Sequence, residues 1–523
     1  MNYISFTFIV FLFGLLGAYV ITPNRYKWIV LLGFSLIFYA SYGIDKLIFM
    51  LGTSVIIYVA ARCIQRIWQQ FDEAASGETI STEEKKKLEK KYTRKSKHVL
   101  VAAMLICFGM MCWCKFGIQA IGWINHFTGK SLAMKILLPL GISYYTFSSV
   151  GYLIDIHWRT VEAEKSYPKL LLCMIYFPHV VEGPIPKYDR LLPQFDRLTF
   201  PDYDRFCKGT QLALWGLFKK MVIADRLGIF VNGVFSNVNS NWGMIYPIAL
   251  TFAAFQLYAD FSGCMDIITG ISDIVGVKLD KNFDHPYLAK TVSEFWRRWH
   301  MSLFNWLKDY LYMPILTSRM MNSLRKAVKK RWGKDAAKMV VSILPTAGVF
   351  LLISFWHSLN MMSLVHAIYW TILIVLSSAT EKGLARLSVR LKIDTKSNIW
   401  RCFQSVRTFS FYAFGFFTVS PSNFKDMVTA FIHMVSKLNP WIFWDGSLYS
   451  YGLDRANFRL AILSIIFLMI AEVFQERCNI RNEIAKCNIV VRWTVYFVGI
   501  FAVLIFGIYG PGYDAAAFLY QQF

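Results

Sequence analysis

The 523-residue sequence is poor in charge and lacks the motifs of common soluble enzymes. Charged residues make up 17% of the chain, only 33 residues are acidic, and no cysteines form a Cys-x-x-Cys pair. Gly-x-Ser-x-Gly, His-Glu-x-x-His and Walker lysine motifs are absent too. Because soluble domains carry about 25% charged residues and disulfide scaffolds need paired cysteines, both classes are excluded, as are zinc proteases and P-loop NTPases.

The chain is rich in hydrophobic residues. Hydrophobic residues make up 56% of the sequence, the mean hydropathy is +0.41, and 56 Lys and Arg residues give a net charge of +23. These basic residues gather between apolar runs, whereas a nucleic-acid-binding domain interleaves them with exposed aromatic residues. The composition therefore predicts a multi-pass membrane protein whose partner is the lipid bilayer, with no nucleic acid.

The distribution of Lys and Arg predicts the orientation of the first spans. Apolar runs cover residues 3–21, 28–42, 47–61, 99–116 and 136–156. The polar segment 62–98 between the third and fourth runs is dense in lysine, and short basic segments stay in the cytoplasm. Counting back three spans places the N-terminus outside, which agrees with the cytoplasmic turn expected at Arg25 and Lys27. No basic segment precedes the first run, so we expect a retained helix rather than a signal peptide.

Beyond residue 160 the apolar runs are shorter or interrupted by Pro, Gly and charge. They cover residues 170–181, 212–231, 246–261, 339–356, 363–378, 409–419, 460–474 and 493–509. Irregular backbone at membrane depth must line a protein cavity, because lipid cannot satisfy its hydrogen bonds. The pattern therefore predicts a pocket or tunnel. Basic segments 319–338 and 382–407 are expected in the cytoplasm, as lipid anchors or as a docking surface for an acidic donor such as a phosphopantetheine carrier or a CoA phosphate.

Residues 293–314 form the most unusual segment. It contains three tryptophans, and Glu294 and Arg298 have the i, i+4 spacing of a helical ion pair. The pattern predicts an amphipathic helix at the membrane interface. Arg297, Arg298 and His300 add a cationic cluster, which leaves a plain interfacial anchor and a functional segment both open.

Ionisable residues within apolar runs are the second signal. His357 ends a run that carries no charge from Val340 onward. Burial keeps an imidazole neutral, so it can act as a base near pH 7, as a hydroxyl attacking an acyl thioester requires. A histidine satisfied within the core is the alternative. Asp260 and Asp266 also follow an apolar run, and we expect them to cap helix N-termini or to line the cavity.

Taken together, the motifs resemble one family. They are Asn282-Phe-Asp-His-Pro-Tyr287, Glu294-Phe-Trp-Arg-Arg-Trp-His-Met-Ser-Leu303, Asp309-Tyr-Leu-Tyr-Met-Pro314 and Phe355-Trp-His357. The sequence resembles the membrane-bound O-acyltransferase (MBOAT) family, in the bacterial branch that includes the alginate O-acetyltransferase membrane subunit and the D-alanyl transfer protein of teichoic acid synthesis. The resemblance implies an all-α polytopic membrane protein, with a ring of transmembrane helices around a central tunnel and short tilted or re-entrant helices.

The resemblance also implies a domain organisation and site residues. Residues 1–420 form the core, with a cytoplasmic basic loop at about 62–98, and residues 421–523 add transmembrane helices to the same membrane domain. His357 is the expected catalytic residue, and His300 is a second active-site residue. The expected substrate-binding residues are Trp296, Arg297, Arg298, Asp309, Trp356 and Asn360. Ser358 departs from the family pattern, in which glycine follows the catalytic histidine.

The function implied is transfer of a short acyl group, with acetyl preferred. No metal or bound cofactor is expected; a cytoplasmic acyl thioester such as acetyl-CoA is the co-substrate, and hydroxyls of an extracytoplasmic or secreted polysaccharide are the acceptor. The expected location is a bacterial plasma membrane, with an SGNH-type acetyltransferase and a glycan synthase complex as possible partners. Alternatives are D-alanyl transfer to teichoic acid, an acyl translocator that serves a separate transferase, and an ion-coupled transporter with a histidine relay, which leaves the motifs unexplained.

Overall fold

The computed structural model describes residues 1–76 and 81–510, and every regular element among them is helical. Seven of the described helices are long and apolar enough to cross a membrane. The chain is thus an all-α, multi-pass membrane protein, as the sequence predicts, whereas the ring around a tunnel stays a prediction. Residues 77–80 of the expected cytoplasmic loop and 511–523 of the expected C-terminal region lie outside the described residues.

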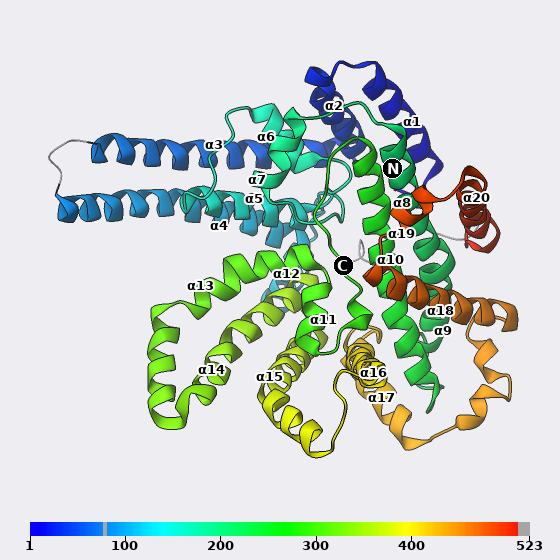
Figure 1. Cartoon of the computed structure of the whole chain (residues 1–523). Coiled ribbons are helices and arrows are strands. Elements are labelled where there is room, and N and C mark those ends of the chain that lie inside the picture. The colour runs from blue at the N-terminus through cyan, green and yellow to red at the C-terminus, as the bar shows by residue number, and fades with distance from the viewer. Residues whose placement is uncertain (77–80, 511–523) are drawn as a thin grey trace. The chain divides into compact units, whose positions relative to one another are not determined.

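The described helices run through almost the whole length of the chain (Figure 1). In chain order they are α1 (Phe6–Ile21), α2 (Lys27–Ala40), α3 (Ile44–Ala75), α4 (Thr82–Thr128), α5 (Ile142–His157), α6 (Tyr167–Ile175), α7 (Tyr188–Leu191), α8 (Tyr203–Leu217), α9 (Asp225–Phe235), α10 (Ile245–Ile274), α11 (Val292–Arg298), α12 (Met301–Leu307), α13 (Met313–Leu316), α14 (Arg319–His357), α15 (Met361–Arg390), α16 (Asn398–Gly415), α17 (Phe424–Ser436), α18 (Arg455–Arg477), α19 (Ile480–Lys486) and α20 (Ile489–Phe506). Two π-helical segments, η3 (Phe218–Ala224) and η5 (Lys308–Tyr312), follow α8 and α12 directly.

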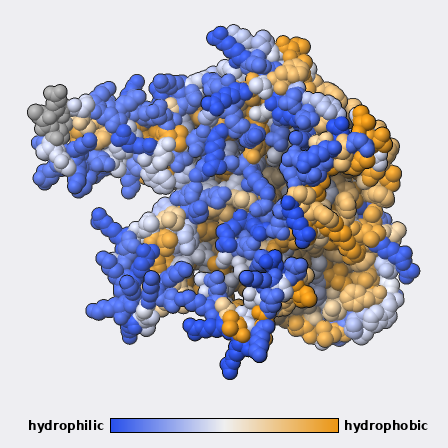
Figure 2. All heavy atoms as spheres, in the orientation of Figure 1, coloured by the Kyte–Doolittle hydropathy of each residue, from blue (hydrophilic) through white to orange (hydrophobic). Residues whose placement is uncertain are grey.

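Most of the segment predicted as a cytoplasmic loop is helical. α3 continues to Ala75, and α4 begins at Thr82 behind a capping box, in which the Ser81 hydroxyl accepts from the Glu84 amide and the Glu84 carboxylate accepts from the Ser81 amide. The lysines that follow favour helix. Figure 1 shows α3 and α4 as antiparallel neighbours, and Figure 2 shows hydrophilic side chains over the arm they form. The charged residues therefore identified a polar segment but did not predict that it is helical, and its cytoplasmic location stays a prediction.

The chain divides into two compact units. The first comprises Met1–Thr210 and Ile268–Asp280. Its core includes a cluster of aromatic rings, in which Phe38 and Phe177 both pack on Phe11. Gly141 has a φ of 64°, and a Cβ there would lie 1.7 Å from the Val180 carbonyl oxygen, so only glycine fits at this start of α5.

The second unit comprises Gln211–Ile267 and the chain from Lys281 onward. Its core joins buried residues of α9, α10, α11, α15 and α16. On the outside of this unit, α20 leaves apolar side chains such as Val490, Val498 and Ile505 exposed, and Figure 2 shows hydrophobic surface where α18 and α20 lie. Such faces suit contact with lipid.

Ion pairs with buried lysines join η3 to α10 and to the start of α9 within the second unit. The Lys220 ammonium lies 2.7 Å from Asp260 and 2.8 Å from Asp225, and the Lys219 ammonium lies 2.8 Å from Asp266. Asp260 and Asp266 lie well inside α10, so the expectation that they cap helix N-termini is wrong. Sequence patterns could not reveal the partners of these carboxylates, because Lys219 and Lys220 lie about 40 residues away along the chain.

Candidate active site

A cavity of about 290 Å³ lies within the second unit. Its walls come from α10, α11, α12, α14, α15 and the end of α16. Most lining side chains are apolar, but three histidines, His300, His357 and His366, also line it. The sequence analysis selected the first two, and the structure brings them together in one cavity.

α14 delivers His357 to this cavity. The helix breaks at Gly333, whose φ of 85° suits glycine, and its apolar second half then runs to His357. Ser358 ends the helix with a φ of −160°, and Asn360 caps α15 through the Ser363 amide. Because extended backbone suits any residue, serine in place of the family's glycine introduces no strain. The Ser358 hydroxyl accepts a hydrogen bond from the Asn360 amide at 2.6 Å.

His300 lies at a break between two short helices rather than within one amphipathic helix. α11 ends at Arg298, His300 adopts a φ of 44°, and α12 begins at Met301. Trp299 and Trp306 are buried in the protein, so these two tryptophans are not free to act as interfacial anchors. The periodicity was misleading because a left-handed residue, which histidine tolerates better than most residues, cannot be recognised from spacing.

Asn282 fixes the orientation of His300. Its Oδ1 accepts from the backbone amide of Ser302, so that atom is the oxygen, and it lies 3.1 Å from His300 Nδ1. Nδ1 therefore carries the hydrogen, and in the neutral ring Nε2 carries a lone pair. Burial lowers the pKa of His300 to about 3, so the ring is neutral at physiological pH.

His366 was missed by the sequence analysis. Its Nε2 accepts from the Trp370 indole at 3.1 Å, so its Nδ1 carries the hydrogen and donates to the Thr418 hydroxyl at 2.6 Å, which in turn donates to the Gly415 carbonyl. Both ring nitrogens are thus engaged, which favours a structural role over proton transfer. The signal that singled out His357, an ionisable residue in an apolar run, applies equally to His366.

Four of the eight residues predicted for the site line the cavity: His300, His357, Trp296 and Asn360. The other four, Arg297, Arg298, Asp309 and Trp356, are not among its lining residues. Arg297 is exposed, and Trp356 is buried beside the His357 ring, with 4.5 Å between the ring centroids. Direct substrate contact from this cavity is therefore best supported for the first four.

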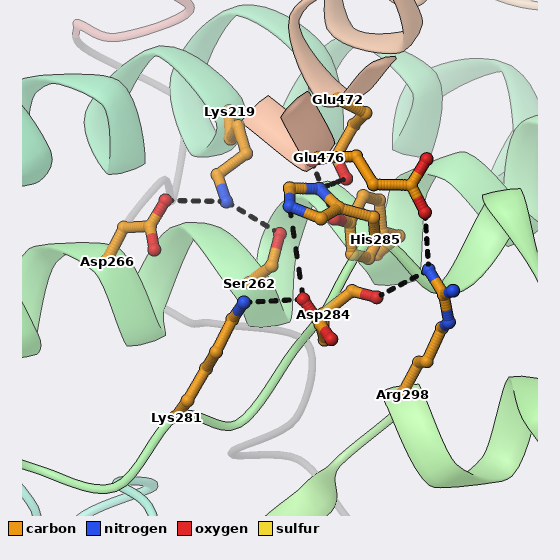
Figure 3. Close-up of polar contacts among 10 residues, drawn as sticks. Lys219, Ser262, Asp266, Lys281, Asp284, His285, Arg298, Glu472 and Glu476 are labelled. Carbon is orange, nitrogen blue, oxygen red and sulfur yellow. Dashed lines mark hydrogen bonds and ion pairs between the residues drawn. The ribbon is translucent and has the colours of Figure 1, made fainter. Parts of the chain in front are cut away.

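Arg298 instead belongs to a network that connects the motif region to α18. Its guanidinium pairs with Glu294 at 2.8 Å and with Glu476 at 3.1 Å. Nearby, Glu472 accepts from the Tyr258 hydroxyl at 2.8 Å and lies 2.6 Å from His285 Nδ1. Figure 3 shows His285 against Glu472 and Arg298 against Glu476. α18 thus holds the loop that supplies Asn282.

Asn282→Leu is expected to lower both activity and stability. Leucine has the branched shape of asparagine but no acceptor, so the variant removes the oxygen to which the His300 Nδ1–H and the Ser302 amide and hydroxyl donate. Removing one partner of a buried hydrogen bond costs about 1–3 kcal/mol. Asn282→Asp, which retains an acceptor oxygen, is the matched control and is expected to lose less. Thermal unfolding in detergent and acyl transfer in membranes measure the two effects. Equal losses in both variants would contradict the role of the oxygen.

Comparison with known proteins agrees with this class of structure, a helical membrane protein with a histidine-lined cavity. Residues 164–327 match the MBOAT, membrane-bound O-acyltransferase family. The chain is 32% identical over 305 residues to the probable alginate O-acetylase AlgI of Pseudomonas aeruginosa, covering 57% of this chain and 54% of the relative. It is 29% identical over 291 residues to the peptidoglycan O-acetyltransferase of Helicobacter pylori, covering 50% and 51%.

A third relative is named for the transfer of D-alanine rather than acetyl. The chain is 27% identical over 288 residues to the teichoic acid D-alanyltransferase of Bacillus subtilis, covering 54% of this chain and 69% of the relative. The aligned part spans about half the length of the alginate and peptidoglycan relatives. The chain is thus similar to the membrane-bound O-acyltransferase family over residues 164–327 and to relatives of both acyl chemistries, in agreement with the resemblance seen in its motifs.

Proposed function

We propose that this protein transfers a short acyl group, acetyl in the first place, from a cytoplasmic thioester such as acetyl-CoA to hydroxyls of an extracytoplasmic polysaccharide. The observation that carries the proposal is one cavity lined by His300 and His357, residues that lie more than 50 positions apart in the sequence. The relatives named as O-acetylases and O-acetyltransferases support acetyl as the group transferred.

In the proposed reaction, His357 is the general base. An acceptor hydroxyl gives its proton to the His357 imidazole while its oxygen bonds to the acyl carbon; the carbon–sulfur bond then breaks, and the proton passes to the leaving sulfur. His300 stays neutral, and its orientation by Asn282 lets it hold donor or acceptor by a hydrogen bond. The apolar walls exclude water, which would otherwise hydrolyse the thioester.

D-alanyl transfer to teichoic acid is the second candidate, favoured by the similarity to a D-alanyltransferase. In a third arrangement the acyl group passes to a separate SGNH-type acetyltransferase within a glycan synthase complex. The test is analysis of acyl groups on wall and secreted polysaccharide from cells with and without the protein. Loss of acetyl esters supports the proposal, loss of D-alanyl esters supports the second candidate, and an unchanged acyl content contradicts both.

The basic half of α14 offers a further test of donor use. Lys326, Lys329, Lys330 and Arg331 are exposed. If they attract an acidic donor, their reversal to Glu is expected to weaken donor use most at low salt, because exposed charges are screened beyond about 8–10 Å at physiological ionic strength. Activity per inserted molecule is measured across ionic strengths. A wild-type salt response with lower abundance would instead assign these residues to lipid anchoring.

A further inference from the structure

Two buried hydrogen-bond donors line the cavity and have no partner among the described residues. They are the Ser354 hydroxyl, on a residue only 3% exposed, and the Trp296 indole N–H. A buried donor without an acceptor costs about 1–3 kcal/mol. Two such donors in one cavity indicate a ligand that supplies an acceptor atom.

Ser354 lies three residues before His357 on α14, so both side chains lie on the same face of the helix. Serines inside helices usually donate to a carbonyl of the preceding turn. Ser342, earlier in α14, does so, with its hydroxyl 2.8 Å from the Met339 carbonyl oxygen. The Ser354 hydroxyl makes no such bond, which leaves it for a group in the cavity.

The Trp296 indole comes from a different helix, α11. An indole N–H can only donate, so the partner it lacks is an acceptor. Aromatic neighbours fix its ring: the centroid of Trp296 lies 4.7 Å from that of Trp370 and 4.8 Å from that of Phe304. The direction of the N–H is therefore set before any ligand binds, which is the condition for stabilising a developing charge.

The remaining walls narrow the chemistry of the ligand. Leu257, Leu303, Ile353, Met362 and Phe416 are among the lining residues. A compact group that is apolar except for one acceptor oxygen matches these walls, and an acyl carbonyl is such a group. A charged phosphate would leave several of its oxygens against apolar side chains.

We propose that Ser354 and Trp296 bind the carbonyl oxygen of the acyl donor. This subsite rests on the proposed function. As the acceptor oxygen bonds to the acyl carbon, the carbonyl electron pair moves onto the carbonyl oxygen, and the two donors stabilise its negative charge. The pair returns when the carbon–sulfur bond breaks, and the proton held by His357 goes to the sulfur. Removal of one such donor typically lowers kcat by about 10²–10³-fold.

The test compares Ser354→Ala and Trp296→Phe with the control Ser342→Ala, whose hydroxyl serves only its own helix. Steady-state transfer from acetyl-CoA is measured per monodisperse protein. We expect each of the first two variants to lower kcat by about 10²–10³-fold, with a much smaller change in the KM for the donor, while the control stays at wild-type values. A higher KM with unchanged kcat would overturn the subsite as a charge-stabilising site.

A spectroscopic measurement separates carbonyl binding from a structural role. The probe is a ketone analogue of acetyl-CoA, isotopically labelled at the carbonyl carbon, bound to purified protein. Hydrogen bonds lower the carbonyl stretching frequency, so we expect a low frequency in the wild type and an increase in both variants. An unchanged frequency and unchanged kcat in both variants would overturn the subsite while wild-type transfer leaves the proposed function intact. Absence of transfer by the wild-type protein would overturn both.

Discussion

His357→Ala is expected to reduce acyl transfer by about 10²–10⁴-fold, the usual contribution of a positioned general base, while the protein still accumulates in the membrane. The half-buried imidazole ends α14, so its truncation removes the proton acceptor without opening a helix. Acyl groups on polysaccharide, measured per inserted molecule, give the result. Normal acylation by a His357→Ala variant that inserts in the membrane would contradict the catalytic role of His357.

The control for this experiment is His126→Ala. His126 is exposed in the last turn of α4 and is expected to tolerate alanine. His433 also lies outside the motifs, but its ring stacks on Trp242 at 3.6 Å between centroids and bonds the Val238 carbonyl. It is therefore a poor control, because its loss removes packing as well as an imidazole.

Lys220→Ala is expected to have the largest effect on stability. Its ammonium is 3% exposed and separates two buried carboxylates, Asp225 and Asp260. Removal takes away the cation that lies between these two buried carboxylates, and breaking a buried pair in this way costs about 3–5 kcal/mol. We expect a large fall in the midpoint of thermal unfolding and poor accumulation in the membrane.

The matched control has the same geometry without burial. Lys382 and Asp335 also lie 2.7 Å apart, but their side chains are 69% and 78% exposed, so Lys382→Ala is expected to leave the unfolding midpoint unchanged. A triple variant, Lys220→Met with Asp225→Asn and Asp260→Asn, removes all three charges and is expected to recover much of the loss. Similar midpoints for Lys220→Ala and Lys382→Ala would show that burial does not decide the outcome.

The sequence predicted the helices better than it predicted their partners. The apolar runs 339–356 and 363–378 lie within α14 and α15, because a run of apolar residues long enough to cross lipid leaves few alternatives to helix. Helix ends were less predictable, as in α3 and α4, where helix-forming residues, mainly Gln, Arg and Ala in α3 and Lys in α4, extend both helices beyond their apolar parts. The charge of a segment predicts its location relative to the membrane, whereas its helix propensity determines its secondary structure, so lysine content alone could not predict these helix ends.

The sequence predicted those site residues whose chemistry is unusual for their neighbours along the chain. His357 stood out because a titratable group ended an apolar run. Ser354 and Asn282 could not be found in this way, because a serine in a helix and an asparagine in a loop become significant only through what they meet in space. The two carboxylate partners of Arg298, one of them nearly 180 residues away, could not be predicted from the sequence either, and substrate contact by Arg298 stays a prediction.

Because α18 contacts the motif region through ion pairs, substitutions in these two distant segments of the chain are expected to depend on each other. His285 lies against Glu472, and Arg298 pairs with Glu476 as well as with its neighbour Glu294. A chimaera that takes residues 1–420 from one relative and the rest from another joins charges that were never matched. A charge change in one segment then requires a matching change in the other. The segment after residue 420 therefore cannot be exchanged independently of the motif region.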